Sequence, residues 1–138
     1  MRHLKSGKKL GRNASHRVAL RRNLTRSLFL SFGAREYVVT TREKAKFVQP
    51  FAERLITLGR EKTLHNYRRG LQLLRDEDAV KKLFDEIGPH YKDRPGGYTR
   101  VIRTSQRRLG DRASQVIFGF VRDEAAPAHA QAAETEAE

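Results

Sequence analysis

Positive charge gathered toward the amino terminus constrains this 138-residue chain more than any other feature of its sequence. Ten lysine and arginine residues precede the first acidic residue, Glu36. Residues 1–122 contain all 29 basic residues against 11 acidic ones, so this part carries a net charge of +18. Like charge at that density opposes a compact fold by self-repulsion. We therefore expect a polyanionic partner that offsets the repulsion.

Several classes of function are excluded by what the chain lacks. Cysteine is absent, which excludes disulfides, thiolate zinc sites, iron–sulfur clusters and a cysteine nucleophile. The five histidines show no HExxH spacing, and Gly7-Lys8 is not followed by the Ser or Thr of a phosphate-binding loop. No apolar run reaches the length of a membrane span, and the basic N-terminus is not a secretory signal. We expect no enzymatic activity, cofactor, metal, small-molecule substrate or membrane association.

Helical and strand patterns follow one another in a definite order. Apolar residues at helical spacing predict four helices, over residues 13–33, 41–59, 64–74 and 76–87. β-Branched and aromatic residues predict three strands, over residues 36–40, 98–104 and 115–121. The order is therefore α-β-α-α-α-β-β. We predict a two-layer α+β fold, in which a three-stranded sheet packs against helices.

Capping and breaking residues set the predicted ends of the helices. Thr40 and Glu43 are spaced as a capping box at the start of the second helix. Pro50 lies inside this helix and is expected to kink it or to mark a restart. Gly88-Pro89 is expected to stop the fourth helix abruptly.

The chain is expected to form one domain with two unlike ends. Residues 1–12 are predicted to be a basic, extended arm that meets phosphate, and residues 13–122 a single α+β domain. Residues 123–138 are rich in Ala and Glu and have no large apolar residue, so we predict a disordered acidic tail. The tail is either a passive extension, which we favour, or an arm that folds back on the basic body.

Arginine-rich segments of the chain favour binding to nucleic acid. Arginine presents a planar fork of donors that matches phosphate. The first helix, capped by Asn13 or Ser15, carries arginines off its apolar stripe, and the loop SQRRLGDRAS between the last two strands adds more. At the start of one strand, Tyr98 either stacks on an unpaired base or packs in the core.

Three segments taken together resemble one family. They are MRHLKSGKKLGRNASHRVALRRNL, VVTTREKAKFVQPFAERLITLGR and RPGGYTRVIR. Over roughly residues 1–122, the chain resembles bacterial large-subunit ribosomal protein seventeen. The resemblance implies an α+β protein of the cytoplasmic ribosome that binds large-subunit ribosomal RNA near the peptide exit side, beside other ribosomal proteins and without enzymatic activity. The RNA-facing residues that it implies are Arg2, His3, Lys5, Arg12, Asn13, His16 and Arg17, with Tyr98, Thr99 and Arg100.

The residues alone indicate a cationic nucleic-acid-binding protein and do not separate RNA from DNA. The resemblance selects ribosomal RNA. The alternative is a nucleoid-type DNA-binding protein, against which stands the lack of an identifiable recognition helix or heptad dimer seam. An enzyme acting on RNA lacks a candidate nucleophile or metal site. The full set of predicted RNA-binding residues is Arg2, His3, Lys5, Lys8, Lys9, Arg12, Asn13, His16, Arg17, Arg21, Arg22, Tyr98, Thr99, Arg100, Arg103, Arg107, Arg108 and Arg112.

Overall fold

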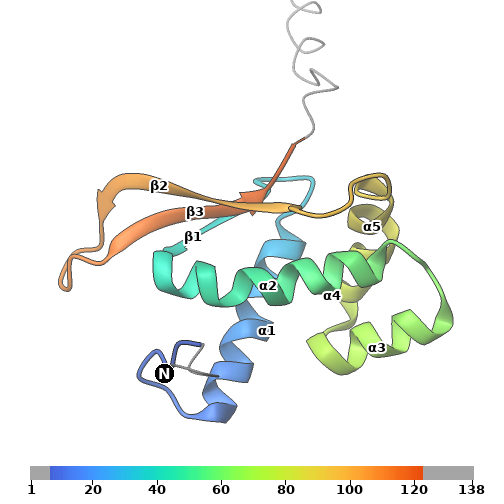
Figure 1. Cartoon of the computed structure of the whole chain (residues 1–138), viewed down its shortest axis with the longest axis horizontal. Helices are drawn as coiled ribbons and strands as arrows, with labels where there is room; N and C mark the ends of the chain where they lie inside the picture. The colour runs from blue at the N-terminus through green and yellow to red at the C-terminus, as the bar shows by residue number, and fades with distance from the viewer. Residues whose placement is uncertain (1–6, 123–138) are drawn as a thin grey trace, which may run out of the picture.

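A computed structural model of the chain describes residues 7–122 (Figure 1). Its elements are α1 (Ala14–Leu30), β1 (Tyr37–Thr41), α2 (Arg42–Gly59), α3 (Leu64–Leu74), α4 (Glu77–Lys82), η1 (Leu83–Ile87), α5 (Gly88–His90), β2 (Thr99–Arg107) and β3 (Ser114–Phe120). Because α4, η1 and α5 follow one another without a break, they form a single fourth helical segment. The predicted order and the α+β class are confirmed. The acidic tail and the first six residues of the predicted arm lie outside the described residues.

The sheet places β3 in the centre, with β1 and β2 antiparallel to it on either side. Val39 of β1 and Ile102 of β2 both lie opposite Ile117 of β3. Side chains alternate between the two faces of a strand, so Val116 and Phe118 are buried on one face while Ile117 lies on the other. Figure 1 shows the long helices on one side of the sheet, which leaves its outer face open.

α2 organises the core because it packs between the sheet and the other helices (Figure 1). Its buried apolar side chains lie at helical spacing on one side and are Ala45, Val48, Ala52, Leu55 and Ile56. Leu28 and Phe29 of α1 join them, and the ring of Phe29 stacks on Phe120 of β3 with 6.3 Å between centroids. Helices and sheet therefore share one hydrophobic core.

The start and middle of α2 differ from the sequence-based expectation. The helix continues through Pro50, which is exposed, so the predicted restart is wrong. Thr41 is the N-cap, and its side chain makes no capping hydrogen bond. Glu43 forms an ion pair with Lys8 instead of reaching back to Thr40. The predicted capping box is therefore wrong, because a full positive charge competes for the Glu43 carboxylate.

The predicted stop at Gly88-Pro89 is also wrong, because the helical path continues to His90. A π-helical turn, η1, carries the chain into α5 and leaves Pro89 in the first turn of that short helix, where proline is tolerated. Gly88 is buried, and a β-carbon there would overlap the carbonyl oxygen of Gly59. Glycine thus serves close packing against α2 at this position instead of chain termination.

Candidate nucleic-acid interface

The described part of the basic arm, residues 7–12, turns back toward the body of the protein. The backbone N–H of Arg12 donates to the carbonyl oxygen of Lys9 at 3.1 Å. Lys8 forms its ion pair with Glu43 in the first turn of α2. Lys9 is exposed and Arg12 is half-buried. Residues 7–12 are therefore held at the amino end of α2 with basic groups on their surface.

A local network joins the arm to the start of α1. Asn13 is the N-cap: its Oδ1 accepts a hydrogen bond from the backbone N–H of His16 at 2.8 Å and another from Ser15 Oγ at 3.1 Å. The Nε of Arg12 donates to Nε2 of His16 at 3.2 Å. Arg17 Nη1 donates to the carbonyl oxygen of Arg12 at 2.6 Å. The predicted RNA-facing residues of this stretch are thus brought together and held by one another.

Further along α1, the arginines contact the protein itself. The guanidinium carbon of Arg21 lies 5.5 Å from the ring centroid of Phe47 and 5.6 Å from that of Phe51. Arg21 thus makes cation–π contacts with two aromatic rings of α2. The Nε of Arg21 is buried and has no hydrogen-bond partner among the described residues. Arg22 donates through Nε to the carbonyl oxygen of Leu73 at 2.8 Å. The structure therefore does not place Arg21 and Arg22 with the arm.

Tyr98 and Thr99 lie in the interior, with exposed fractions of 1% and 5%. The Tyr98 ring packs against Tyr91 at 5.3 Å between centroids, and its hydroxyl accepts from Thr57 Oγ1 at 3.3 Å. The Thr99 hydroxyl donates to Glu53 Oε1 at 2.9 Å. Of the two sequence-based readings of Tyr98, core packing is the one that the structure shows. Its ring is not available to stack on a base, because it is buried against Tyr91 just before β2 begins.

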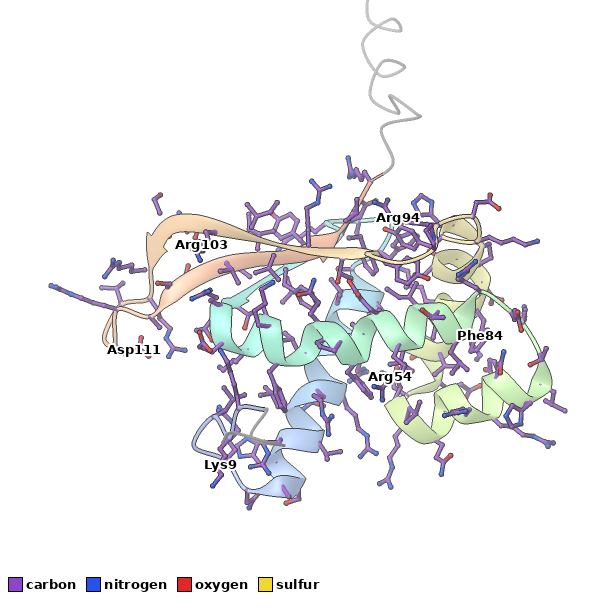
Figure 2. All side chains as sticks on the ribbon, viewed as in Figure 1. Lys9, Arg54, Phe84, Arg94, Arg103 and Asp111 are labelled. Carbon is purple, nitrogen blue, oxygen red and sulfur yellow. The ribbon has the colours of Figure 1, made fainter. Side chains whose placement is uncertain are left out.

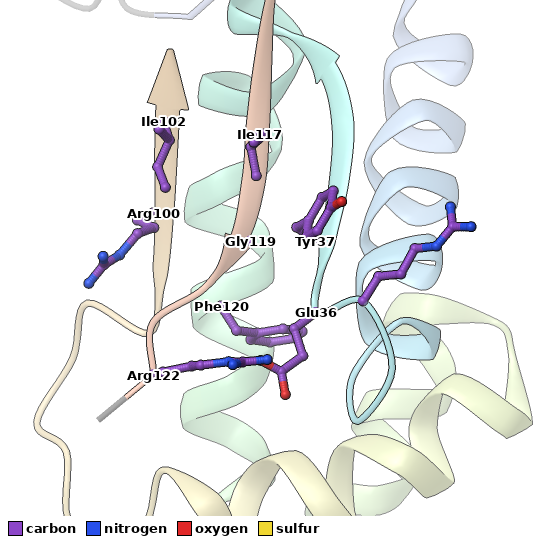
Figure 3. A pocket seen from close by; sticks show the side chains of 9 residues that line it. Glu36, Tyr37, Arg100, Ile102, Ile117, Gly119, Phe120 and Arg122 are labelled. Atoms are coloured by element: carbon purple, nitrogen blue, oxygen red, sulfur yellow. The ribbon is translucent and has the colours of Figure 1, made fainter. Parts of the chain in front are cut away.

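Arg100 points the other way, onto the outer face of the sheet (Figure 3). A shallow hollow of about 500 Å³ lies there, with Tyr37, Ile102 and Ile117 on its floor. Arg35, Arg100 and Arg122 stand at its rim, and Arg122 Nε donates to Glu36 Oε2 at 2.6 Å. Arg35 and Arg122 are not among the residues predicted from sequence, because they follow different elements and line the same hollow only when β1 and β3 pair.

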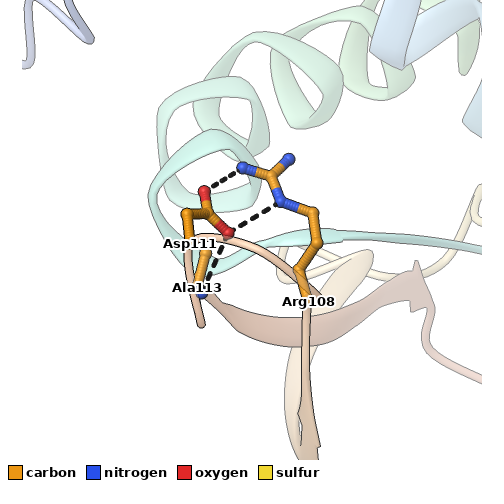
Figure 4. Close-up of polar contacts among 3 residues, drawn as sticks. All are labelled: Arg108, Asp111 and Ala113. Carbon is orange, nitrogen blue, oxygen red and sulfur yellow. Dashed lines mark hydrogen bonds and ion pairs between the residues drawn. The ribbon is translucent and has the colours of Figure 1, made fainter.

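The β2–β3 hairpin ends in a loop held by one ion pair (Figure 4). Arg108 donates two hydrogen bonds to Asp111, from Nε to Oδ1 at 3.0 Å and from Nη2 to Oδ2. Asp111 Oδ1 also accepts a hydrogen bond from the backbone N–H of Ala113 at 3.2 Å. The hydrogen bond from Arg108 is the main cause that lowers the pKa of Asp111 to about 2. Arg108 is thus largely neutralised by its partner, while the loop that it closes keeps a defined shape.

The other hairpin arginines, Arg103, Arg107 and Arg112, are exposed. β2 extends to Arg107, beyond the predicted end at 104, and its pairing with β3 is irregular between Arg103 and Arg107. No hydrogen bond or ion pair within residues 7–122 engages these three side chains. They therefore present free guanidinium groups, Arg103 midway along β2, where Figure 2 labels it, and Arg107 and Arg112 beside the hairpin loop.

The arm and the hairpin converge at the amino end of α2. Thr41, the N-cap of α2, pairs with Gln115 at the start of β3, directly beside the hairpin loop. The Lys8–Glu43 ion pair holds the arm to the same end of α2. The labels of Lys9 and Asp111 in Figure 2 mark this shared end of the molecule. The structure thus unites two predicted basic segments that are about a hundred residues apart in sequence.

The remaining sequence-based predictions concern the first residues of the arm, membrane association and metal binding. Arg2, His3 and Lys5 lie outside the described residues. Within residues 7–122, no helix is long and apolar enough to cross a membrane. In the same part of the chain, no three His, Cys, Asp or Glu side chains gather in a way that suits a metal ion.

Comparison with known proteins identifies the family. The family described as "Ribosomal protein L17" matches residues 20–121. The chain is similar to proteins named "Large ribosomal subunit protein bL17" from three organisms. The Thermus thermophilus protein is 51% identical over 121 residues, which are 88% of this chain and 99% of the relative. The Desulfotalea psychrophila protein is 50% identical over 88% of this chain and 90% of the relative, and the Syntrophotalea carbinolica protein is 45% identical over 99% and 85%. The chain therefore belongs to the ribosomal protein L17 family.

Proposed function

We propose that this chain is a structural constituent of the large ribosomal subunit that binds large-subunit ribosomal RNA at the amino end of α2. The observation that carries the proposal is the convergence of the basic arm with the exposed arginines of the β2–β3 hairpin. Membership of a ribosomal protein family favours ribosomal RNA over the nucleoid DNA of the alternative hypothesis.

The two segments have complementary roles in this proposal. The hairpin extends past the start of α2 (Figure 1), so Arg107 and Arg112 can reach phosphates that the body of the protein does not touch. Lys9 and Arg12 contact phosphates beside the body. Contacts of this kind fix the position of a protein on RNA and do not read sequence, so recognition rests on the shape of the folded RNA.

The proposal also includes a position for the protein on the large subunit. We place the chain near the peptide exit side, beside other ribosomal proteins, on the strength of the family resemblance. The three relatives are named as proteins of the large ribosomal subunit. In a cell lysate, the chain should sediment with large subunits at moderate salt, and sedimentation as free protein or with the chromosomal fraction would contradict the proposed function.

A pair of double variants tests the hairpin. Arg107→Gln with Arg112→Gln removes two free cations, whereas Lys62→Gln with Lys81→Gln removes two cations already paired with Asp85 and Glu77. Both variants lower the net charge by the same amount. Affinity for large-subunit RNA should fall about tenfold in the hairpin variant, and the slope of log K against log salt should lose about 1.4–1.8, since each phosphate contributes about 0.7–0.9.

The control variant should keep the affinity and the slope within a factor of about two. Equal losses in the two variants would mean that only net charge matters and would contradict a hairpin site. The same titration with duplex DNA of random sequence separates the two hypotheses. Binding to DNA as tight as to ribosomal RNA at each salt concentration would favour the nucleoid alternative.

A further inference from the structure

A second basic hollow lies between α1 and α3, away from the arm and the hairpin. It has a volume of about 660 Å³ and is lined mainly by Arg22, His65, Arg68, Arg69, Gln72 and Arg75. On α3, His65, Arg68 and Gln72 follow one another at intervals of three and four residues, which places them on one side of the helix. The opposite side carries the buried Gly70 and Leu74 that pack against the core.

Two of the arginines are set in place by the backbone. The Nε of Arg22 donates to the carbonyl oxygen of Leu73, one of the carbonyls that the end of α3 leaves unpaired within the helix. This hydrogen bond orients the guanidinium group and leaves its Nη donors for a ligand. Arg75 is the C-cap of α3 and has a positive φ of 57°, which brings the chain, and with it the Arg75 side chain, round to the hollow.

Within residues 7–122, the charges of this hollow have no counterions. No acidic residue lines it. Arg68, Arg69 and Arg75 make no side-chain hydrogen bond or ion pair within the described part of the chain. The lysines of the same helical layer differ: Lys62 pairs with Asp85 at 2.6 Å and Lys81 with Glu77 at 3.0 Å. Unpaired charge is therefore concentrated in the hollow, where an anion would relieve the mutual repulsion.

The basic side chains favour phosphate as that anion. The cations that line the hollow are arginines, with no lysine among them. The arginine fork donates two parallel hydrogen bonds to one phosphate, which a lysine cannot do. Several such forks side by side suit a chain of phosphates more than a single small anion, because each phosphate of a backbone can meet a different guanidinium group.

We propose that the hollow between α1 and α3 is a second RNA-backbone site, which binds a segment of ribosomal RNA separate from the one at the hairpin. This rests on the proposed function, in that it takes the ligand to be the same RNA. Figure 1 shows α3 and the hairpin loop at opposite ends of the molecule, so the two sites would contact different stretches of RNA backbone. The protein then ties two RNA segments together, and each site raises the effective concentration of RNA at the other.

Footprinting on RNA tests the proposal. Large-subunit RNA with the full-length protein bound should show two separate segments protected from hydroxyl radicals. Arg68→Gln with Arg69→Gln should abolish one protected segment, leave the other, and weaken overall binding about tenfold. The hairpin variant Arg107→Gln with Arg112→Gln should abolish the other segment. Lys62→Gln with Lys81→Gln, which removes equal charge, should leave both.

Other footprinting results would contradict either the second site or the proposed function. If the α3 variant keeps both protected segments and the hairpin variant loses one, the second site is wrong while the proposed function stands. If the wild-type protein protects no segment, the proposed function itself fails. Thermal unfolding of the α3 variant serves as the folding check, and Arg68→Lys with Arg69→Lys gives a second one. This variant keeps the positive charges but lacks the paired donors of the guanidinium group. We expect it to restore part of the protection that the Gln variant loses.

Discussion

Glycine decides how closely α2 approaches the fourth helical segment. A β-carbon at Gly88 would overlap the carbonyl oxygen of Gly59, and a β-carbon at Gly59 would lie 2.9 Å from Cδ1 of Leu83. The contact partner of Gly88 is backbone, which cannot rotate away as a side chain can. Two helical segments that are not adjacent in sequence therefore meet at a distance that only glycine permits at position 88.

Gly88→Ala should destabilise the protein by about 1–3 kcal/mol, as overpacking of a core does. Its φ of −58° suits alanine, and helix propensity alone would favour the change by about 1 kcal/mol, so the clash must outweigh that gain. Urea unfolding measures the difference. Gly96→Ala is the matched control, because nothing lies within 4 Å of a β-carbon there and its φ is not positive. A Gly88→Ala protein as stable as wild type would show that α2 can move aside.

At the scale of elements, the β2–β3 hairpin combines an irregular ladder with a loop closed by charge. Leu109 at its tip is 99% exposed, so apolar burial does not hold the loop. The two hydrogen bonds between Arg108 and Asp111 do so instead. Gly110 and Arg112 both have positive φ, which allows the tight turn that brings these two side chains together. The shape in which the hairpin presents its arginines therefore depends on the ionisation of Asp111.

Order in the hairpin loop should depend on pH in a defined window. The folded pKa of Asp111, about 2, lies below its ordinary value of 3.8, so the ionised form stabilises the fold. This contribution is complete above about pH 4 and is lost as the pH falls through 2. A carboxyl-carbon NMR titration measures the pKa, and Arg108→Gln should move it back toward 3.8 because Arg108 is the main cause of the shift. A titration near 3.8 in the wild-type protein would contradict the ion pair.

At the scale of the whole molecule, cations separate into paired and unpaired groups. The chain is a protein of a ribosomal family and is not an enzyme. Lys8, Arg26 and Arg122 make ion pairs that link distant elements. Unpaired arginines among the described residues include Arg107 and Arg112 of the hairpin and Arg68 and Arg69 of α3. The free protein thus carries repulsion at both ends that bound RNA would remove.

The thermal midpoint of the free protein should rise with salt. Between 0.01 M and 0.15 M NaCl, the Debye length falls from about 30 Å to about 8 Å, which screens repulsion between the two ends more than it screens ion pairs in contact. Over the same range, affinity for RNA should fall. Calorimetry at a series of NaCl concentrations measures the midpoint, with sucrose as an uncharged control for general solute effects. A midpoint that falls with salt would mean that the surface ion pairs outweigh the repulsion.

Much of the fold follows from local sequence. The positions of α1, α3 and the three strands agree with prediction within a few residues, because apolar periodicity and β-branched content act within one element. The capping box at Thr40 and the helix stop at Gly88 were wrong because each depended on a residue elsewhere in the chain. Lys8 forms an ion pair with Glu43, so this carboxylate does not cap the helix. Gly88 is glycine because a β-carbon there would overlap the carbonyl oxygen of Gly59. The predicted disorder of the acidic tail stays a prediction, since it lies beyond the described residues.

The sequence by itself determined the cationic character of the chain, the α+β class and the family. Tertiary structure decided which cations are free. Arg17, Arg21, Arg22 and Arg107 look alike in sequence, yet only Arg107 has an unengaged guanidinium group, because the others face a carbonyl oxygen or aromatic rings. The central position of β3 likewise depends on pairing between residues as far apart in sequence as Tyr37 and Gly119. Contacts between residues so far apart are set by the packing of the whole core, which no local pattern encodes.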